Sequence, residues 1–332
     1  MRYLLTGGTG FIGQNLAGKI VARGHRVRAL VRASSRTAGL EALGVELARG
    51  DVTCPDALPG AVDGCDVVVH LAGLVKAIGR EEYLRVNALG TRALALACAG
   101  ARHRPRLVLV SSLAAAGPAA PGRPRREEDP PAPVSLYGES KLAAEREVQG
   151  VAGRVEAVIL RPPIVYGPGD KELLPALFRM ARLGVVLKAG LGDKRYSVVH
   201  VEDLCDAILA AAERGKAVGR EGHEGIYFIA DGVEHAWEDI GRAVLDALGA
   251  RGRILAVPEA VSWLVAAGSA VASGLTGLPA MLSFDKMNEI RQSAWTCAID
   301  RACRELGFSP RYPLAEGMRQ SADWFRARGL VK

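Results

Sequence analysis

RYLLTGGTGFIGQNLA, residues 2–17, is the stretch that decides the fold of this 332-residue chain. Its apolar start predicts a buried strand, and Gly7, Gly10 and Gly13 lead into a helix that begins near Phe11. Residues without a Cβ let the backbone approach a pyrophosphate, whose charge is stabilised by amide N–H groups at the helix N-terminus. We therefore expect a dinucleotide here. A plain tight turn stays open as the alternative, because the chain has 39 glycines.

The first half of the chain repeats this strand–helix unit. Short β-branched runs alternate with helices rich in Ala, Leu and Arg, a rhythm typical of parallel β-α-β units. From Gly117 to Val134 the chain carries six of its 17 prolines, which predicts a long loop. The fold class is therefore α/β, a doubly wound parallel sheet of the Rossmann type. The strand-like runs are residues 3–6, 27–31, 45–48, 66–70, 106–110 and 155–160.

A smaller, mostly helical substrate domain is expected after Tyr166. Helical patterns lie around residues 171–183, 237–248, 259–274 and 314–328, whereas 198–212 and 225–230 still resemble pieces of the sheet domain. We predict a dinucleotide-binding domain of residues 1–166 plus 198–231. The substrate domain would be residues 167–197 plus 232–332.

Composition narrows the class of protein. With 49% hydrophobic and 24% charged residues, disordered, collagen-like and disulfide-stapled chains are excluded. The net charge of +7 is scattered, and only 5% of residues are aromatic, so nucleic-acid binding is not expected. Six cysteines without metal-ligand spacing predict a reduced protein with no metal site. Since the amino terminus enters a strand pattern at once, we expect no export signal and a cytoplasmic location.

One long segment carries no charge. Val261 to Leu282 is 22 residues long, which passes the length test for a membrane span, but its Ala, Gly and Ser content and Pro279 make it a weak candidate. A core or dimer-contact helix is the favoured interpretation, and contact with a membrane surface stays open.

The end of the second strand bears on the choice of cofactor. An acidic residue there would bind the adenosine ribose, but the chain has Val31 and Arg32. Arg32, helped by Ser34 and Arg36, could instead bind a 2′-phosphate, so NADP is favoured over NAD. The alternative is that these arginines only solvate a loop.

A serine, a tyrosine and a lysine form the candidate catalytic group. SLYGESKLAAEREV reads as a helix capped by Ser135, with Tyr137 and Lys141 on one face because they are four residues apart. A phenol ionises near pH ~10, and an adjacent ammonium lowers that value, which makes a general acid/base. Upstream, a strand ends in Ser111 and Ser112, whose hydroxyls could polarise a carbonyl.

Seven motifs in order resemble the extended short-chain dehydrogenases/reductases, the NAD-dependent epimerase/dehydratase group. They span nearly the whole chain, which makes the set far more specific than any one motif. The motifs are TGGTGFIG, DVVVHLAG (66–73), VNALGT (86–91), VSS before a variable loop, YGESK, LRPPIVYGPGD (160–170) and VVHVEDL (198–204).

The resemblance implies roles for individual residues. Ser112, Tyr137, Lys141 and Asn87 would be catalytic, although Asn87 could equally make only a helix hydrogen bond. Lys141 would also hold the nicotinamide ribose and depress the tyrosine pKa. His200 and Asp203 look structural, Asp203 as a helix cap. Together with Arg32, the expected cofactor-binding residues are Gly7, Gly10, Phe11, Ile12, Gly13, Asp51, Val52, Leu71, Ala72, Ser111, Lys141, Pro163 and Ile164.

Departures from the family pattern indicate the substrate. Leu113 and Ala114 replace the acidic pair of the sugar dehydratases, and Ile164 replaces an Asn that meets the sugar diphosphate in epimerases. Ala116 replaces an aromatic residue, and Arg195 lies one residue away from the position of the epimerase phosphate-binding Arg. Each change removes a polar or stacking contact for UDP.

The chain thus looks more like the 3β-hydroxysteroid dehydrogenase and dihydroflavonol reductase branch. That likeness implies hydride transfer between nicotinamide and a secondary alcohol or ketone of a lipophilic small molecule. A homodimer is expected. Two alternatives stay open: a nucleotide-sugar 4-epimerase or reductase, and a non-catalytic NADP-binding sensor or complex subunit.

Overall fold

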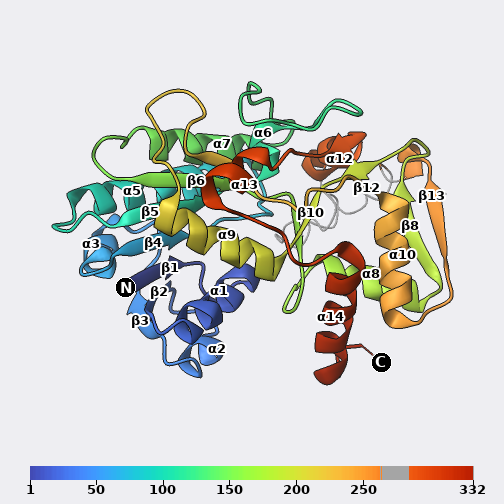
Figure 1. The fold of residues 1–332 in the computed structure, drawn as a ribbon, viewed down its shortest axis with the longest axis horizontal. Helices are drawn as coiled ribbons and strands as arrows, with labels where there is room; N and C mark the ends of the chain where they lie inside the picture. Colours follow the sequence, from blue (N-terminus) through green and yellow to red (C-terminus); the bar gives the residue numbers. More distant parts are fainter. Residues whose placement is uncertain (262, 264–283, 332) are drawn as a thin grey trace.

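The computed structural model describes residues 1–261, 263 and 284–331. Its centre is a parallel sheet of seven strands in the order β11-β6-β5-β4-β1-β2-β3 (Figure 1). This order steps outward in both directions from β1, which is the doubly wound arrangement that the sequence predicts. The strands are β1 (Arg2–Thr6), β2 (Arg26–Val31), β3 (Glu46–Arg49), β4 (Val67–His70), β5 (Arg106–Val110), β6 (Ala157–Arg161) and β11 (Ile226–Phe228).

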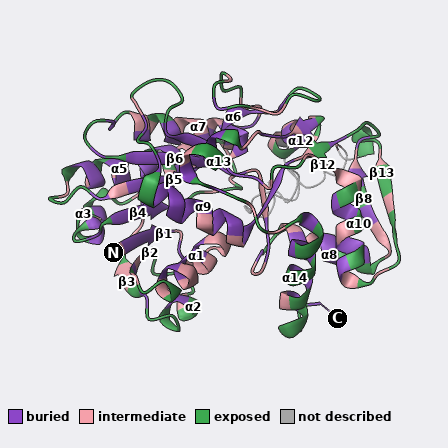
Figure 2. Ribbon diagram, in the orientation of Figure 1, coloured by how far each residue is buried: buried purple, intermediate pink, exposed green. Residues whose placement is uncertain are grey.

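Helices cover both faces of the sheet. One apolar cluster joins the sheet to α1 (Phe11–Ala22), α9 (Val201–Arg214) and α13 (Asp300–Leu306), and a second joins it to α3 (Leu58–Val62), α5 (Gly90–Gly100) and α7 (Leu136–Gln149). The central strands are buried on both sides and the outer helix faces are exposed (Figure 2). The buried faces explain why these strands are continuous apolar runs rather than alternating ones.

Shorter elements connect these layers. The segment before α5 contains α4 (Arg80–Tyr83) and a π-helical turn, η2 (Leu84–Leu89), and β5 is followed by α6 (Leu113–Ala116). The remaining short helices are α2 (Ala38–Glu41) and η1 (Pro55–Ala57). Residues 117–134 form the predicted loop, which is tied to residues 294–298 by backbone hydrogen bonds.

Beyond Tyr166 a separate apolar cluster forms around three helices. These are α8 (Leu173–Arg182), α10 (Trp237–Leu248) and α14 (Leu314–Ala327), at the right of Figure 1, and all three match predicted helices. The predicted helix at 259–274 lies almost wholly outside the described residues. The strands here are more numerous than the sequence indicated: β7 (Ile164–Tyr166) pairs with β10 (Val198–His200), β8 (Val185–Ala189) with β13 (Arg253–Val257), and β9 (Arg195–Tyr196) with β12 (His235–Ala236) and β14 (Ala294–Trp295).

The division into two domains stays a prediction. Residues 225–230 do supply a strand, β11, to the main sheet. However, α13 lies within the predicted substrate domain, yet Ala302, Leu306 and Phe308 pack in the sheet cluster. Within the described part of the chain, no helix has both the length and the apolar character needed to cross a bilayer.

Candidate active site

The glycine turn brings β1, α1 and the end of β4 into backbone contact. Gly7 has a φ of 72°, and a Cβ there would lie 2.7 Å from the backbone of both Leu71 and Ala72. A Cβ on Gly13 would lie 2.6 Å from Cα of Gly8. Since those neighbours are backbone atoms that cannot move aside cheaply, glycine is required at both positions.

The N-terminus of α1 presents amide groups without a side-chain cap. Its N-cap residue is Gly10, and no side chain accepts a hydrogen bond from the first turn, which starts with Phe11 and Ile12. The first N–H groups of a helix have no intrahelical acceptor, so they are suited to an anion such as a pyrophosphate. The glycine turn and these amides therefore fit the phosphates of a dinucleotide.

A hollow of about 690 Å³ lies at the ends of β2 and β3. Arg32 and Asp51, both predicted, line it, and the Arg32 side chain is 67% exposed with its Nε 4.0 Å from Oδ2 of Asp51. Arg49 and Cys54 also line the hollow and were missed. The register of β2 and β3 places Arg49 beside Val31, and its Nη1 donates to the carbonyl of Arg32 at 3.4 Å. A sequence signal existed, because Arg49 is two residues before Asp51.

The three predicted catalytic side chains converge at the carboxyl end of the sheet. Ser112 follows β5 and caps α6, accepting from Ala114 N at 3.1 Å. Tyr137 lies in the first turn of α7, and its phenol hydrogen-bonds with the Ser112 side chain. One turn further on, Lys141 is buried and its Nζ donates to the carbonyl of Val110 at 2.8 Å. As predicted, Ser135 caps α7, accepting from Gly138 N at 3.0 Å.

The pKa of Tyr137 is shifted in the opposite direction from the one that the sequence predicts. Burial raises the pKa of the Tyr137 phenol, and the hydrogen bond from Ser112 opposes that shift only in part. Burial also lowers the pKa of Lys141 to about 8. The expectation that Lys141 depresses the tyrosine pKa is therefore wrong for this structure, because desolvation dominates and the ammonium is directed at Val110.

The Asn87 side chain makes three hydrogen bonds that link separate segments of the chain. Its Oδ1 accepts from Leu74 N at 2.7 Å, and its Nδ2 donates to Leu74 O at 3.0 Å and to Ser140 Oγ at 2.9 Å. These bonds tie the loop after β4 to α7. A catalytic role for Asn87 remains a hypothesis.

The other predicted cofactor residues border the turn or support the catalytic group. Leu71 N donates to Thr6 O at 3.1 Å, Ala72 N donates to Thr6 Oγ1 at 3.2 Å, and Val52 packs beneath Gly90. The Ser111 hydroxyl donates to Oε1 of Glu145 at 2.5 Å, and Pro163 and Ile164 lead into β7. Their contacts with a cofactor stay predictions.

The helix cap at α9 is corrected by the structure. His200, rather than Asp203, is the N-cap residue, and its Nδ1 accepts from Glu202 N at 3.4 Å. Asp203 instead accepts from the backbone N–H groups of Arg311 and Tyr312 at 3.0 and 3.1 Å, so it joins α9 to the segment before α14. Both residues are structural, as expected.

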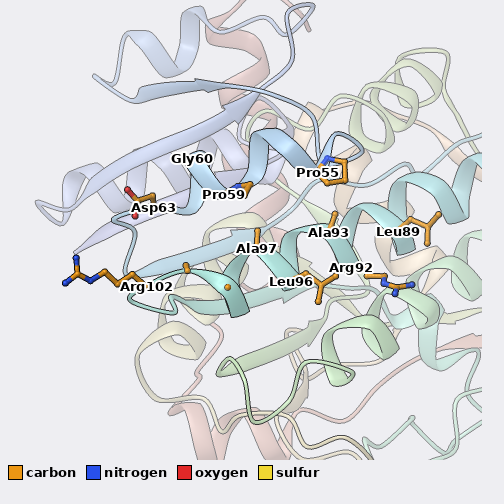
Figure 3. A pocket seen from close by; sticks show the side chains of 12 residues that line it. Pro55, Pro59, Gly60, Asp63, Leu89, Arg92, Ala93, Leu96, Ala97 and Arg102 are labelled. Carbon is orange, nitrogen blue, oxygen red and sulfur yellow. The ribbon is translucent and has the colours of Figure 1, made fainter.

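A second, larger hollow, of about 840 Å³, lies between α3 and α5 (Figure 3). Pro59, Leu89 and Leu96 line it, and no predicted catalytic or cofactor-binding residue does. It therefore stands apart from the catalytic group.

The seven-stranded parallel sheet and the glycine turn after its first strand define a Rossmann-type α/β protein. Residues 3–229 match the model of the NAD dependent epimerase/dehydratase family, and the chain belongs to that family. The predicted family membership is confirmed, and with it the prediction that the protein is an enzyme.

Three proteins illustrate the range of similar chains. A ceramide reductase from Caulobacter vibrioides is 34% identical over 98% of this chain and 95% of its own. A 4-hydroxy-2-methyl-3-oxo-4-farnesyl-3,4-dihydroquinoline-1-oxide ketoreductase from Stigmatella aurantiaca is 31% identical over 96% of this chain and 95% of its own. The solved structure of MoeE5, in complex with UDP-glucuronic acid and NAD, matches with a TM-score of 0.75 at 25% identity, covering 99% of this chain and 100% of MoeE5. Oxidoreductase chemistry is the common theme of the two named reductases.

Proposed function

We propose that the protein is an NADP-dependent reductase that interconverts a ketone and a secondary alcohol on a lipophilic substrate. The observation that carries this proposal is the meeting of Ser112, Tyr137 and buried Lys141 beside the glycine turn. NAD is the alternative cofactor.

The chemistry divides between the cofactor and the side chains. When bound, the nicotinamide supplies the hydride for the carbonyl carbon, or accepts it in the reverse direction. Tyr137 gives its hydroxyl proton to the carbonyl oxygen, which becomes the alcohol oxygen. Ser112 would hold that oxygen by a hydrogen bond, and Lys141 would bind the ribose.

The preference for NADP rests on the two arginines at the adenosine end. Arg32 and Arg49 line one hollow, and among the described residues neither has a carboxylate closer than the 4.0 Å between Arg32 Nε and Asp51 Oδ2. Guanidinium groups match the geometry of a phosphate, so this pair is suited to a 2′-phosphate.

A lipophilic substrate is supported by the loop beside Tyr137. Tyr83 lies with its ring centroid 6.2 Å from that of Tyr137, and its hydroxyl donates to Val75 O at 3.0 Å. Val75 and Ile78 in this loop are 56% and 68% exposed, which is unusual for large apolar side chains unless they meet a ligand or partner. The names of the two reductases, one acting on a ceramide and one on a farnesyl compound, favour the same class.

The test is oxidation of NADPH against a panel of long-chain keto lipids, steroid ketones, flavonoid ketones and UDP-sugars. Tyr137→Phe should keep cofactor affinity and lower turnover of the best ketone by roughly 10²–10⁴-fold, the usual contribution of general acid catalysis. Tyr312→Phe, which removes a phenol from a ring that stacks on His200, is the control and should leave turnover unchanged. Unchanged turnover in Tyr137→Phe would remove that residue from the chemistry.

Two other outcomes favour the alternatives. Conversion of a UDP-sugar with no net change in NADPH would identify an epimerase, a function suggested by the UDP-glucuronic acid in the MoeE5 structure. Tight NADP binding with no turnover of any substrate would favour a sensor or complex subunit.

The remaining parts of the proposal concern the state of the protein in the cell. We propose a cytoplasmic homodimer, to be tested by sedimentation, and the exposed Leu89 at the end of η2 and Leu96 on α5 offer an apolar surface for a second copy. Contact of residues 261–282 with a membrane surface lies outside the described residues apart from Val261 and Trp263.

A further inference from the structure

We propose that Asp285 and Glu289, on α12 (Phe284–Ile290), are positioning residues that fix the first turn of α7 and keep the phenol of Tyr137 in its proton-donating form. This inference rests on the proposed function. It concerns a short helix from the C-terminal third of the chain, which the sequence analysis did not connect with the catalytic group.

The carboxylates of α12 bind the N-terminus of α7 directly. Leu136 N donates to Oδ1 of Asp285 at 2.6 Å, and Tyr137 N donates to Oδ2 at 3.5 Å. The capping hydroxyl of Ser135 donates in turn to Oε1 of Glu289 at 2.6 Å. Because these first-turn N–H groups have no acceptor within their own helix, α12 supplies what the helix itself lacks. Negative charge at a helix N-terminus is also favourable.

The opposite end of α12 is anchored just as firmly. The buried ammonium of Lys194 donates to the carbonyls of Ile290, Arg291 and Gln292 at 2.8, 2.8 and 3.0 Å. Trp295 Nε1 donates to Glu289 O at 2.9 Å. The helix α12 is therefore held between Lys194, just before β9, and the first turn of α7. Its carboxylates consequently have a fixed position near Tyr137.

The charge on α12 also acts on the phenol. Burial is the main cause of the raised pKa of Tyr137, and the negative charge of Glu289 adds to it. Burial likewise raises the pKa of Tyr83 to about 12, with Asp285 adding to that shift. The charge of Glu289, which is hydrogen-bonded to Ser135 two residues before Tyr137, disfavours a phenolate at residue 137, so the neutral phenol is favoured and the residue is poised to donate a proton.

Other charged groups around α7 are already paired or act in the opposite sense. Lys141, one turn along, directs its ammonium at the carbonyl of Val110, and Ser112 stabilises the phenolate by a hydrogen bond. The remaining ion pairs near this helix are Arg161 with Glu145, Arg80 with Glu139, Arg92 with Glu147, and Lys286 with Glu289. In the part of the chain that the structure describes, Asp285 and Glu289 are the carboxylates from outside α7 that accept hydrogen bonds from Ser135, Leu136 and Tyr137.

The first measurement needs no turnover. Hydrogen exchange of the Leu136 and Tyr137 amides, in the full-length protein with NADP bound, should be about tenfold faster in Asp285→Asn, since one hydrogen bond to a charged acceptor is weakened. Asp246→Asn, an exposed carboxylate on α10, is the matched control and should not change those amides. Wild-type exchange in Asp285→Asn would overturn the positioning role.

The second measurement is the pH profile of ketone reduction. In Glu289→Gln the fall of turnover at alkaline pH should begin at lower pH than in the wild type, because the charge that disfavours the phenolate is gone. Glu316→Gln, exposed on α14, is the control. A purely structural role would lower the amount of active enzyme without moving this limb, and that result would refute the electrostatic part.

Failure of the proposed function is distinguishable from failure of this inference. If the wild type reduces no ketone, the proposed function fails while the exchange measurement still decides whether α12 fixes the first turn of α7. If Glu289→Gln does not fold, Ser135→Ala removes only the hydroxyl that links α7 to Glu289. It should speed exchange of the Gly138 amide, which otherwise donates to that hydroxyl, and normal exchange there would count against the link.

Discussion

Replacing Glu145 by Gln should lower the free energy of unfolding by several kcal/mol, because this change leaves the buried guanidinium of Arg161 without its counter-charge. The carboxylate receives two hydrogen bonds from Arg161, Nε to Oε1 at 2.9 Å and Nη2 to Oε2 at 2.6 Å, and one from Ser111 at 2.5 Å. The side chains of Arg161 and Glu145 are only 2% and 1% exposed. An amide of the same shape leaves the guanidinium without its counter-charge, and breaking a buried pair from one side costs ~3–5 kcal/mol.

The assay is urea unfolding followed by circular dichroism, comparing midpoints at equal slope. Glu156→Gln is the matched control. Its partner is Arg106 at 3.0 Å, but the Glu156 side chain is 71% exposed, so we expect a loss of ~0–1 kcal/mol. The double variant Glu145→Met/Arg161→Met should recover much of the lost stability, since apolar residues often replace a buried pair at little cost. If Glu145→Gln lost no more stability than Glu156→Gln, the reasoning from burial would be refuted.

Two further predictions concern the cofactor and pH. Arg32→Ala should weaken NADP binding by about tenfold or more, which is the usual value of a charge-assisted contact, and leave NAD binding nearly unaffected. Fluorescence titration of both cofactors measures the two affinities. Equal losses for the two cofactors would contradict the assignment of the 2′-phosphate site. Burial lowers the pKa of His70 to about 3 in the folded protein. In the unfolded chain His70 takes up a proton below pH ~6.5, whereas in the folded protein it stays neutral until the pH approaches 3. Stability should therefore fall as pH drops from about 6.5 toward 3, by at most ~1.4 kcal/mol per pH unit from this residue. Urea midpoints measured at pH 4.5, 5.5 and 7 should fall less steeply with decreasing pH in His70→Gln than in the wild type. An equally steep fall in the variant would show that other groups cause the loss of stability.

Local pattern was sufficient for the sheet and its nearest helices. The central strands of the main sheet are short apolar runs, and the turn at Gly7 can be recognised in the sequence by its residues that lack a Cβ. The cap at Ser135 and the helix that carries Tyr137 and Lys141 could likewise be predicted from the sequence, because a cap and a four-residue spacing are properties of neighbouring residues.

Contacts between distant segments were beyond such reasoning. Asp285 is 149 residues from Leu136, and no periodicity or motif connects the two. Arg49 is two residues before Asp51 in the sequence, but its place beside Val31 follows from the pairing of β2 with β3. The sign of the pKa shift at Tyr137 was also mistaken, because spacing reveals a nearby ammonium but not the loss of water around a phenol.

By itself, then, the amino-acid order determined an α/β sheet with a glycine turn after its first strand and a Ser, Tyr and Lys group at its carboxyl edge, since these follow from side-chain periodicity and from residue types at short spacing. Tertiary structure alone decided which groups are removed from water and which carboxylates contact the first turn of α7. Burial and long-range charge depend on the position of every element that packs around a residue, and α12 meets α7 only after the whole chain has folded.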